Sequence, residues 1–283
     1  MPELPEVETV LRGLSPFLLK QKIIDIDVRS PSLRIPIPKT KLKKLCRSQI
    51  VSLVRRAKYI LINFECGETI ISHLGMTGSF TVFLPDQHHK INMDRHDHLV
   101  LTTDKNVKII YRDPRRFGMI DVVKTADINK HKAFKEMGPE PLDKSFTAEV
   151  LKEKLKTRSI AIKPAIMDQK VVVGVGNIYA SEALFLAGID PTTSASTLSL
   201  KKLHLLVEKI KFILTAAIQS GGSTLRDYRR VGGETGYFQF QFSVYDKESE
   251  ACPDCTCSLK RTGGIQKIVQ AGRSTFYCST KQK

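Results

Sequence analysis

The first three residues of the chain carry groups that could form a covalent bond to a substrate. Pro2 follows the initiator methionine, which is normally removed before a small residue, and removal would leave a secondary amine at the chain start. An α-amino group titrates near pH ~8, so part of it is unprotonated at neutral pH and can attack an electrophilic carbon to form an iminium. Glu3 could transfer the proton that this reaction requires. Most chains that begin with Met-Pro make no chemical use of the proline, so this interpretation depends on the other motifs.

Two basic motifs could bind phosphate groups. In RRAKY (residues 55–59), two arginines precede Lys58, which could also act as an acid or base; the alternative is a solvated loop. The turn DPRRFG (113–118) places Arg115 close to Phe117. An arginine beside an aromatic ring can enter a base stack and fill the space left by an extruded base. The alternative is a basic turn with a core phenylalanine.

Two further motifs combine glycine or histidine with exposed-looking side chains. HLGMTG (73–78) places Met76 in a glycine-rich turn from which its side chain could project, although a hairpin with a core methionine is the alternative. RHDH (95–98) puts His96 and His98 on one side of an extended segment. No third metal ligand is evident nearby, so a phosphate contact from His96 is the better interpretation.

The segment VVVGVGNIYASEALF (171–185) resembles a dinucleotide-binding fingerprint only in part. Tyr179 stands where the third glycine of G-x-G-x-x-G would be. We therefore expect a glycine-lined turn that leads into a helix starting near Asn177, whose N-terminal amide groups favour phosphate.

Six cysteines are unevenly distributed, and four of them fall within the last 32 residues: Cys252, Cys255, Cys257 and Cys278. A zinc ribbon contains C-x₂-C twice; the first pair is present, but Lys281 stands where the fourth cysteine would be. The chain start lacks the basic residues and apolar core of a secretory signal, so we expect a metal site rather than disulfides. Cys46 and Cys66 are expected to be small buried hydrophobic residues.

The net charge points to a polyanionic partner. Lys and Arg total 45 and Asp and Glu total 29, a formal net charge of +16. A chain this basic is attracted to nucleic acid through counterion release; the alternative is a merely basic or ribosome-associated protein. No apolar run of about 18 residues is present, so we expect no membrane span.

The elements that must hold these groups follow from residue periodicity. Val7, Val10, Leu11 and Leu14 have helical spacing, and Gly13 or Pro16 should end this first helix. Seven β-rich runs before residue 125, several of which alternate apolar and polar residues, predict a sandwich or barrel: 22–28, 49–54, 59–65, 69–75, 79–84, 97–103 and 107–113.

Helical patterns dominate after a Pro- and Gly-rich stretch at 137–146. Ser199 can cap a long helix that ends at Gly221-Gly222. Its apolar stripe comprises Leu203, Val207, Ile210, Leu214 and Ala217. The tail from residue 241 resembles a hairpin-type finger.

Together, these motifs resemble one known family. MPELPEVE, RRAKY, HLGMTG, RHDH, DPRRFG, GPEPL, the VVGVGNIYASEALF run and GRSTFYC occur in this order in bacterial formamidopyrimidine-DNA glycosylases. The resemblance covers the whole chain and implies an α+β protein of two domains. These are an N-terminal β-sandwich and a C-terminal helical domain with a helix–two-turn–helix and a zinc-type β-hairpin finger. We expect the sandwich over 1–134, the helix–two-turn–helix over 143–240 and the finger over 244–283.

The resemblance also implies roles by position. The catalytic positions are Pro2 (nucleophile at the sugar carbon), Glu3 (acid/base), Lys58 (DNA contact and elimination) and Arg273 (final elimination and phosphate binding). The residues that fill the space of the flipped nucleotide are Met76, Arg115 and Phe117. The DNA-contacting positions are His96, Arg158, Lys163 and Asn177. A Schiff base at Pro2 followed by β,δ-elimination would then cut the strand.

The family contains a second branch, endonuclease VIII, which prefers oxidised pyrimidines and usually begins PEGPE. Leu4 here indicates the branch directed to oxidised purines such as 8-oxoguanine and formamidopyrimidines. The alternatives are a pyrimidine-directed enzyme and a damage-binding protein with impaired turnover; a nicotinamide-dependent enzyme is disfavoured by Tyr179. The resemblance implies a monomer acting on double-stranded DNA in the bacterial cytoplasm, associated with the nucleoid.

The finger departs from the family pattern. In this chain 22 residues separate Cys255 from Cys278, more than is usual in the family, and the fourth cysteine is replaced by Lys281. Cys257 could supply the missing ligand for one structural Zn²⁺, together with Cys252, Cys255 and Cys278. The alternative is a finger without zinc, as in some eukaryotic relatives.

Overall fold

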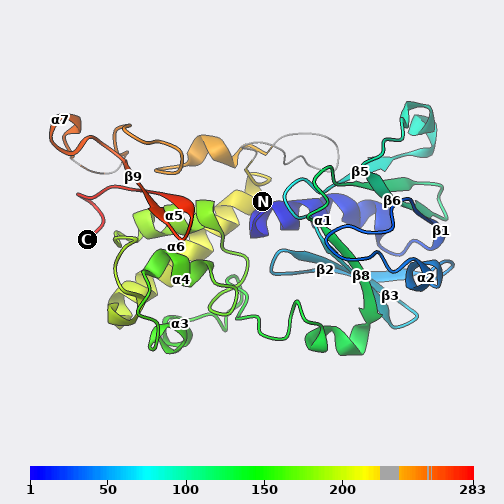
Figure 1. Cartoon of the computed structure of the whole chain (residues 1–283), viewed down its shortest axis with the longest axis horizontal. Helices are drawn as coiled ribbons and strands as arrows, with labels where there is room; N and C mark the ends of the chain where they lie inside the picture. The colour runs from blue at the N-terminus through cyan, green and yellow to red at the C-terminus, as the bar shows by residue number, and fades with distance from the viewer. Residues whose placement is uncertain (224–235, 254, 256) are drawn as a thin grey trace. The chain divides into compact units, whose positions relative to one another are not determined.

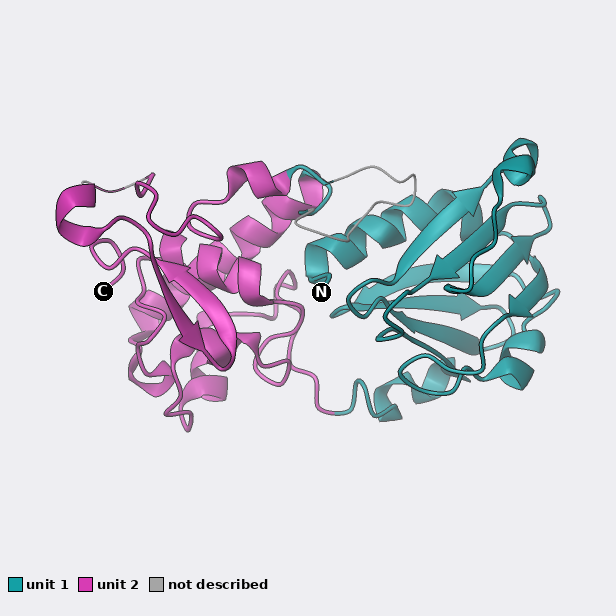
Figure 2. Cartoon of the chain, turned by 45° about the horizontal axis from the view of Figure 1, so that its top comes forward, with its two compact units in different colours: residues 1–135, 220–237 teal, residues 136–219, 238–283 magenta. Residues whose placement is uncertain are grey.

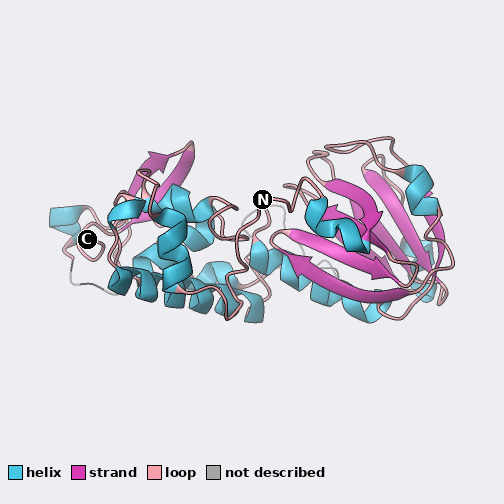
Figure 3. Ribbon diagram, turned by 90° about the horizontal axis from the view of Figure 1, so that it is seen from below, coloured by secondary structure: helices cyan, strands magenta, loops and turns pink. Residues whose placement is uncertain are grey.

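The structure is a computed structural model of the chain, and it describes residues 1–223, 236–253, 255 and 257–283. These residues form two compact units (Figure 2): 1–135 with 220–237, and 136–219 with 238–283. Strands dominate the first unit and helices the second (Figure 3). The expected α+β class is confirmed, while the three-part division at 134, 143, 240 and 244 stays a prediction.

The first unit begins with the helix α1, Leu4–Leu18. The helix continues through Gly13 and Pro16, so the expected end at either residue was wrong. Proline lacks the N–H for the helical hydrogen bond and crowds the preceding turn. Burial of Leu14 and Leu18, both 0% exposed, offsets that cost because it keeps the last turn against the core.

Two four-stranded antiparallel sheets follow, in the strand orders β1-β6-β7-β5 and β2-β3-β4-β8. The strands are β1 (Ile23–Val28), β2 (Ile50–Arg56), β3 (Tyr59–Phe64), β4 (Glu68–His73), β5 (Ser79–Phe83), β6 (Asp97–Thr103), β7 (Lys108–Arg112) and β8 (Met119–Lys124). All seven expected runs form strands. The sequence interpretation missed β8, which pairs with β4 along its whole length.

One apolar core joins both sheets and α1, so the sheets form a sandwich as expected. It contains Val10 of α1, Ile62 of β3, Leu101 of β6 and Ile109 of β7. Short elements cover the rest of the unit: α2 (Lys39–Lys43), η1 (Pro85–Lys90) and η2 (Thr125–Lys130). Cys46 is only partly buried and Cys66 is exposed, so burial was wrongly expected for Cys66, which lies in the turn between β3 and β4.

The second unit contains the helices from α3 onward and the β9–β10 hairpin (Figure 1). Its elements are α3 (Ala148–Leu155), α4 (Ile162–Met167), α5 (Asn177–Leu186), η3 (Ala195–Thr197), α6 (Leu200–Gln219), η4 (Phe238–Gln241), α7 (Leu259–Thr262), β9 (Gln266–Gln270) and β10 (Arg273–Tyr277). The helix α6 is the expected long helix: Ser199 Oγ accepts the N–H of Lys202 at 3.3 Å, and the whole predicted stripe is buried. The start of α5 at Asn177 and the hairpin of the tail are also confirmed. Among the described helices, none combines the length and apolar composition that a membrane span requires.

Candidate active site

The start of the chain is fixed by the first turn of α1. Pro2 and Glu3 are buried, and Glu3 is the N-cap residue of α1. Glu6 accepts the backbone N–H of Glu3 at 2.8 Å, and its other carboxylate oxygen accepts the N–H and hydroxyl of Ser223 at 2.9 and 3.1 Å. Sequence reasoning missed Glu6, although an acidic residue three positions after a helix N-cap is the signal of a capping box. Met1 is in place in the structure, so Pro2 carries a peptide bond here.

The turn between β2 and β3 presents Lys58, which is buried. The backbone turns at Ala57, whose φ is +54°. Arg55 stabilises this turn through two hydrogen bonds. Its Nε donates to Glu8 Oε2 at 3.0 Å, and its Nη1 donates to the Ala57 carbonyl at 3.2 Å. Because Glu8 lies on α1, this ion pair connects the lysine turn to the helix that directly follows Pro2 and Glu3.

His73, at the end of β4, is a site residue that sequence reasoning missed. Its ring packs on Tyr59 with centroids 4.7 Å apart, and its Nδ1 accepts the N–H of Gly75 at 3.0 Å. Burial, with the positive charges of Lys58 and Arg34, lowers the pKa of His73 to about 4. The ring is therefore neutral at pH 7 and carries its proton on Nε2, because Nδ1 accepts a bond. The signal was the first residue of HLGMTG, from which only Met76 was used.

Three side chains project from two loops of the same unit. Met76 is 37% exposed and Phe117 is 48% exposed, so neither is a core residue. The Arg115 guanidinium lies over the Phe117 ring at 4.8 Å. This stacked pair, with Met76 from the neighbouring loop, has the form of a wedge that could enter a base stack. We call Met76, Arg115 and Phe117 the wedge.

The two histidines of RHDH have different environments. His98 is fully buried and bonds Ser30 Oγ and the Asp113 carbonyl, both at 2.8 Å. His96 is half-buried, and its Nε2 accepts a bond from Arg95 at 3.2 Å. His98 therefore supports the fold, while His96 lies closer to the surface.

The second unit gathers basic residues around one pocket of about 190 Å³. The pocket is lined by Lys163, Pro164, Met167, Asp168, Gln270, Ala271 and Arg273. Arg158 forms an ion pair with Asp168 at 2.7 Å, and Arg273 is exposed at the start of β10. Three predicted site residues, Arg158, Lys163 and Arg273, thus meet in this unit.

Lys163 and Asn177 are held inside the same unit. The Lys163 ammonium donates to Asn177 Oδ1 at 2.7 Å, to Thr275 Oγ1 at 2.7 Å and to the Ser274 carbonyl at 3.0 Å. The Asn177 amide donates to the Ser274 carbonyl at 2.9 Å. These bonds join α4 and α5 to β10, the strand that begins with Arg273. A direct DNA contact from either side chain stays a prediction.

Glu182, five residues after Asn177 on α5, is another residue that sequence reasoning missed. Its buried carboxylate accepts the backbone N–H groups of Ser243, Val244 and Tyr245 at 2.8–3.0 Å. Desolvation raises the pKa of Glu182, and these amide hydrogen bonds oppose that rise. The Tyr245 ring in turn packs on Phe276 of β10 with centroids 5.2 Å apart. Glu182 therefore anchors the chain that supports the hairpin.

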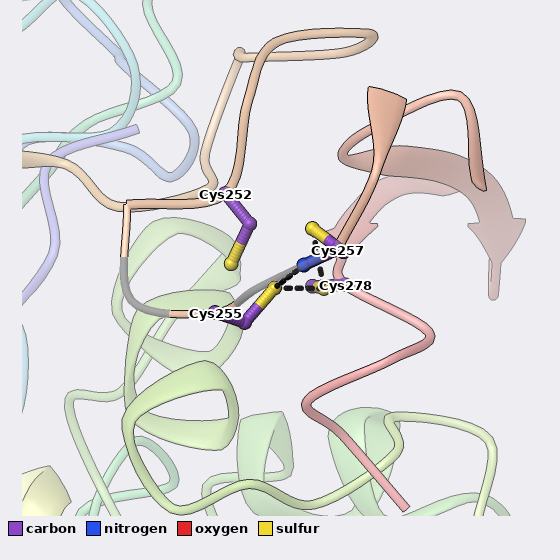
Figure 4. A group of neighbouring side chains, drawn as sticks. All are labelled: Cys252, Cys255, Cys257 and Cys278. Atoms are coloured by element: carbon purple, nitrogen blue, oxygen red, sulfur yellow. Dashed lines mark hydrogen bonds between the residues drawn. The ribbon is translucent and has the colours of Figure 1, made fainter. Parts of the chain in front are cut away.

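The four C-terminal cysteines converge (Figure 4). Their sulfur atoms all lie within 4.8 Å of one another; the Cys278 sulfur is 3.5 Å from that of Cys255 and 3.9 Å from that of Cys257. A tetrahedral zinc site with Zn–S bonds of about 2.3 Å has sulfurs about 3.8 Å apart. The spacing and the all-thiol donor set fit a tetrahedral metal ion, with Cys257 in the cluster although it is only two residues from Cys255.

Lys281 lies in a different environment from that of a ligand. Its ammonium is 4.1 Å from the centroid of the Phe185 ring on α5, a cation–π contact. Burial alone would raise the pKa of the Cys278 thiol, but hydrogen bonds from the backbone amides of Lys281 and Thr280 lower it. The turn that follows Cys278 thus stabilises its thiolate, the form that binds metal.

Comparison with known proteins identifies relatives of the whole chain. Residues 1–120 match a family model described as the formamidopyrimidine-DNA glycosylase N-terminal domain, and residues 137–229 match the H2TH domain of the same enzymes. Curated proteins named formamidopyrimidine-DNA glycosylase from Rhodospirillum rubrum and Bdellovibrio bacteriovorus are 45% and 46% identical, with 100% of both chains covered.

Solved structures give the same result. A mutant of the Lactococcus lactis FPG protein in complex with Fapy-dG containing DNA has a TM-score of 0.88 at 36% identity over 100% of both chains. A complex of the Lactococcus lactis protein with DNA containing an abasic site has a TM-score of 0.87 at 36% identity over 99% of both chains. Each of these proteins is similar to the present chain along its full length.

Proposed function

This chain belongs to the formamidopyrimidine-DNA glycosylase family, and we propose that it removes oxidised purines from DNA in base excision repair and then cleaves the strand as a lyase. The observation that carries this proposal is the full-length similarity to enzymes of that name, at 45% identity to the first of them. Related proteins bind Fapy-dG and abasic-site DNA in solved complexes. The substrate of this chain is therefore damaged double-stranded DNA, in agreement with its net charge of +16.

Pro2 is the proposed nucleophile. After removal of Met1, its amine sits immediately before the N-terminus of α1, a 15-residue helix. The positive end of the helix dipole disfavours a protonated amine there, and this leaves the nitrogen lone pair free to attack C1′ of the deoxyribose. As the C–N bond to the base breaks, the new C–N bond to Pro2 forms, and ring opening gives a Schiff base. Glu3 is proposed to move the proton between the sugar oxygen and solvent.

Lys58 is proposed to contact the phosphate beside the lesion and to assist the elimination. Its turn is connected to α1 by the Arg55–Glu8 ion pair. His73, with its neutral ring and an Nε2 proton, could donate a hydrogen bond to the same phosphate region without adding charge. After elimination on the 3′ side, a second elimination on the 5′ side would release the sugar, with Arg273 at the second phosphate.

The wedge and the second unit supply the binding energy for base extrusion. Flipping a nucleotide out of a duplex costs a few kcal/mol. Insertion of Met76, Arg115 and Phe117 into the vacated space would offset part of it. Lys163 and Arg273, which line the pocket, are proposed to bind the DNA backbone together with Arg158 and Asn177. His96 is proposed as a further phosphate contact.

We propose that the cysteine cluster holds one structural Zn²⁺ through Cys252, Cys255, Cys257 and Cys278. The spacing of the four sulfurs supports this ligand set. The ion would hold the finger and thereby the hairpin that carries Arg273, and it takes no part in the chemistry. We further propose that the enzyme acts as a monomer in the bacterial cytoplasm, on the nucleoid.

Borohydride trapping on a duplex that contains 8-oxoguanine tests the proposal. The parent protein should form a covalent complex whose peptide map places the DNA on Pro2, and Pro2→Glu, in which the large second residue keeps Met1 in place, should abolish trapping. Cleavage of a thymine glycol duplex in preference to 8-oxoguanine would instead indicate the pyrimidine-directed branch. Tight binding without strand cleavage would indicate a damage-binding protein. Retention of Met1 in fully active enzyme would contradict the role of Pro2.

A further inference from the structure

Two separate loops carry the wedge, and one side-chain contact joins them. Met76 lies between β4 and β5, whereas Arg115 and Phe117 lie between β7 and β8. The Thr77 hydroxyl donates to Asp113 Oδ1 at 2.5 Å and accepts the backbone N–H of Arg115 at 3.1 Å. Thr77 therefore contacts two residues of the second loop's turn, Asp113 and Arg115, from a position next to Met76.

Asp113 is itself held rigidly. It is 0% exposed, and its second carboxylate oxygen accepts the N–H of Gly118 at 2.7 Å. Its backbone carbonyl is bonded by His98 Nε2 at 2.8 Å. A buried carboxylate must have its hydrogen bonds satisfied. Loss of the Thr77 donor would therefore disturb the whole 113–118 turn and not only one contact.

The backbones of the two loops are also in direct contact. A Cβ on Gly75, whose φ is +62°, would lie 2.4 Å from the carbonyl carbon of Phe117. A Cβ on Gly118 would lie 1.9 Å from the hydroxyl of Tyr111, which donates to the His73 carbonyl at 3.3 Å. Two neighbouring loops that pack this closely can be fixed in register by one hydrogen-bonded pair.

We propose that Thr77 and Asp113 are positioning residues that lock the two loops together, so that the wedge enters the base stack as one preorganised unit. Two exposed loops that moved independently would lose conformational freedom each time the wedge was inserted. The lock removes most of that loss before DNA binds. The inference rests on the proposed function, because a wedge is needed only where a base leaves a duplex.

The test compares two substitutions of Thr77. Thr77→Val keeps the shape of the side chain but removes its hydroxyl, whereas Thr77→Ser keeps the hydroxyl. In Thr77→Val we expect single-turnover excision of 8-oxoguanine from a duplex to slow about tenfold, the effect of losing one hydrogen bond to a carboxylate. The fluorescence rise of a 2-aminopurine next to the lesion, which reports extrusion of its neighbour, should slow by the same factor. Thr77→Ser should restore both rates. Thr81→Val, on the exposed side of β5, is the matched control.

Cleavage of an abasic site in single-stranded DNA distinguishes a loss of wedge positioning from a general loss of enzyme activity. Single-stranded DNA has no duplex base stack for the wedge to enter. The rate of this cleavage should stay within about twofold of the parent rate in Thr77→Val. Equal losses on single and double strands, or an unchanged duplex rate, would overturn the proposal. If Thr77→Val folds poorly, Thr77→Ala leaves room for water and gives the same comparison. The fluorescence assay needs no turnover, so it tests the lock even if the parent fails to cleave, an outcome that would instead overturn the proposed function.

Discussion

The neutral, buried His73 should make the stability of this protein depend on pH in a way that one substitution removes. The pKa of its imidazole is 6.5 without perturbation and about 4 in the folded chain, because of burial and the charges of Lys58 and Arg34. Between these values the unfolded chain binds a proton that the folded chain does not. The free energy of unfolding therefore falls as the pH decreases.

The magnitude follows from linkage. The contribution of His73 is fully present above pH 6.5, begins to disappear as the pH falls through 6.5 and is lost below about pH 4. At pH 5 the unfolded imidazole is almost fully protonated, while the folded one is still mostly neutral. The expected loss from this group between pH 7 and pH 5 is about 2 kcal/mol, at ~1.4 kcal/mol for each pH unit in which only the unfolded form is protonated.

The assay is urea unfolding at pH 7 and pH 5, followed by far-ultraviolet circular dichroism. His73→Asn keeps an acceptor near the position of Nδ1 but cannot be protonated. Its change in unfolding free energy between the two pH values should be smaller than that of the parent by about 2 kcal/mol. His89→Asn on the exposed surface of η1 is the control and should retain the parent's pH dependence. Equal pH dependence in His73→Asn and the parent would refute this account of the site.

Three further substitutions test the second unit. Lys163→Met removes a buried ammonium from three acceptors, one of them on Asn177. It should lower the free energy of unfolding by about 2–4 kcal/mol, measured by urea unfolding, and weaken DNA binding, measured by fluorescence anisotropy. Glu182→Gln places an amide NH₂ against backbone donors and should cost about 1–3 kcal/mol by the same unfolding assay. Cys257→Ser should reduce the zinc content of purified protein to a small fraction of one ion per chain, measured by atomic absorption. The exposed Cys66→Ser should leave it unchanged.

Local patterns in the sequence predicted most of the secondary structure. Short β-rich runs, several with alternating apolar and polar residues, predicted seven strands, and the stripe from Leu203 to Ala217 predicted α6. Such patterns are readable because each residue's burial repeats with the period of its own helix or strand. The strand β8 was missed because it begins directly after the DPRRFG turn, and that segment was interpreted only as a turn. The end of α1 was misjudged because packing of Leu14 and Leu18 outweighs the local cost of Pro16.

Motif order was informative about the family, and residue type about the chemistry, but neither revealed the environments of the side chains. Phe117 and a core phenylalanine are indistinguishable in sequence, yet Phe117 is 48% exposed. Lys163 was expected at a DNA-contacting surface, and its ammonium lies among Asn177 and the backbone of β10. Burial of a single polar residue depends on what covers it, and the covering residues come from elsewhere in the chain.

The sequence by itself predicted the α+β class, which is confirmed, and the ligand candidates of the finger; the chemistry of Pro2 stays a prediction. Only the tertiary structure decided that Cys257 joins the cluster, that His73 is neutral beside Lys58, and that Thr77 bonds Asp113. The Thr77–Asp113 bond joins residues 36 positions apart, and the Lys163–Thr275 bond joins residues 112 positions apart. Periodicity carries information over one helix or strand, whereas such pairs form only after the sheets and helices have packed.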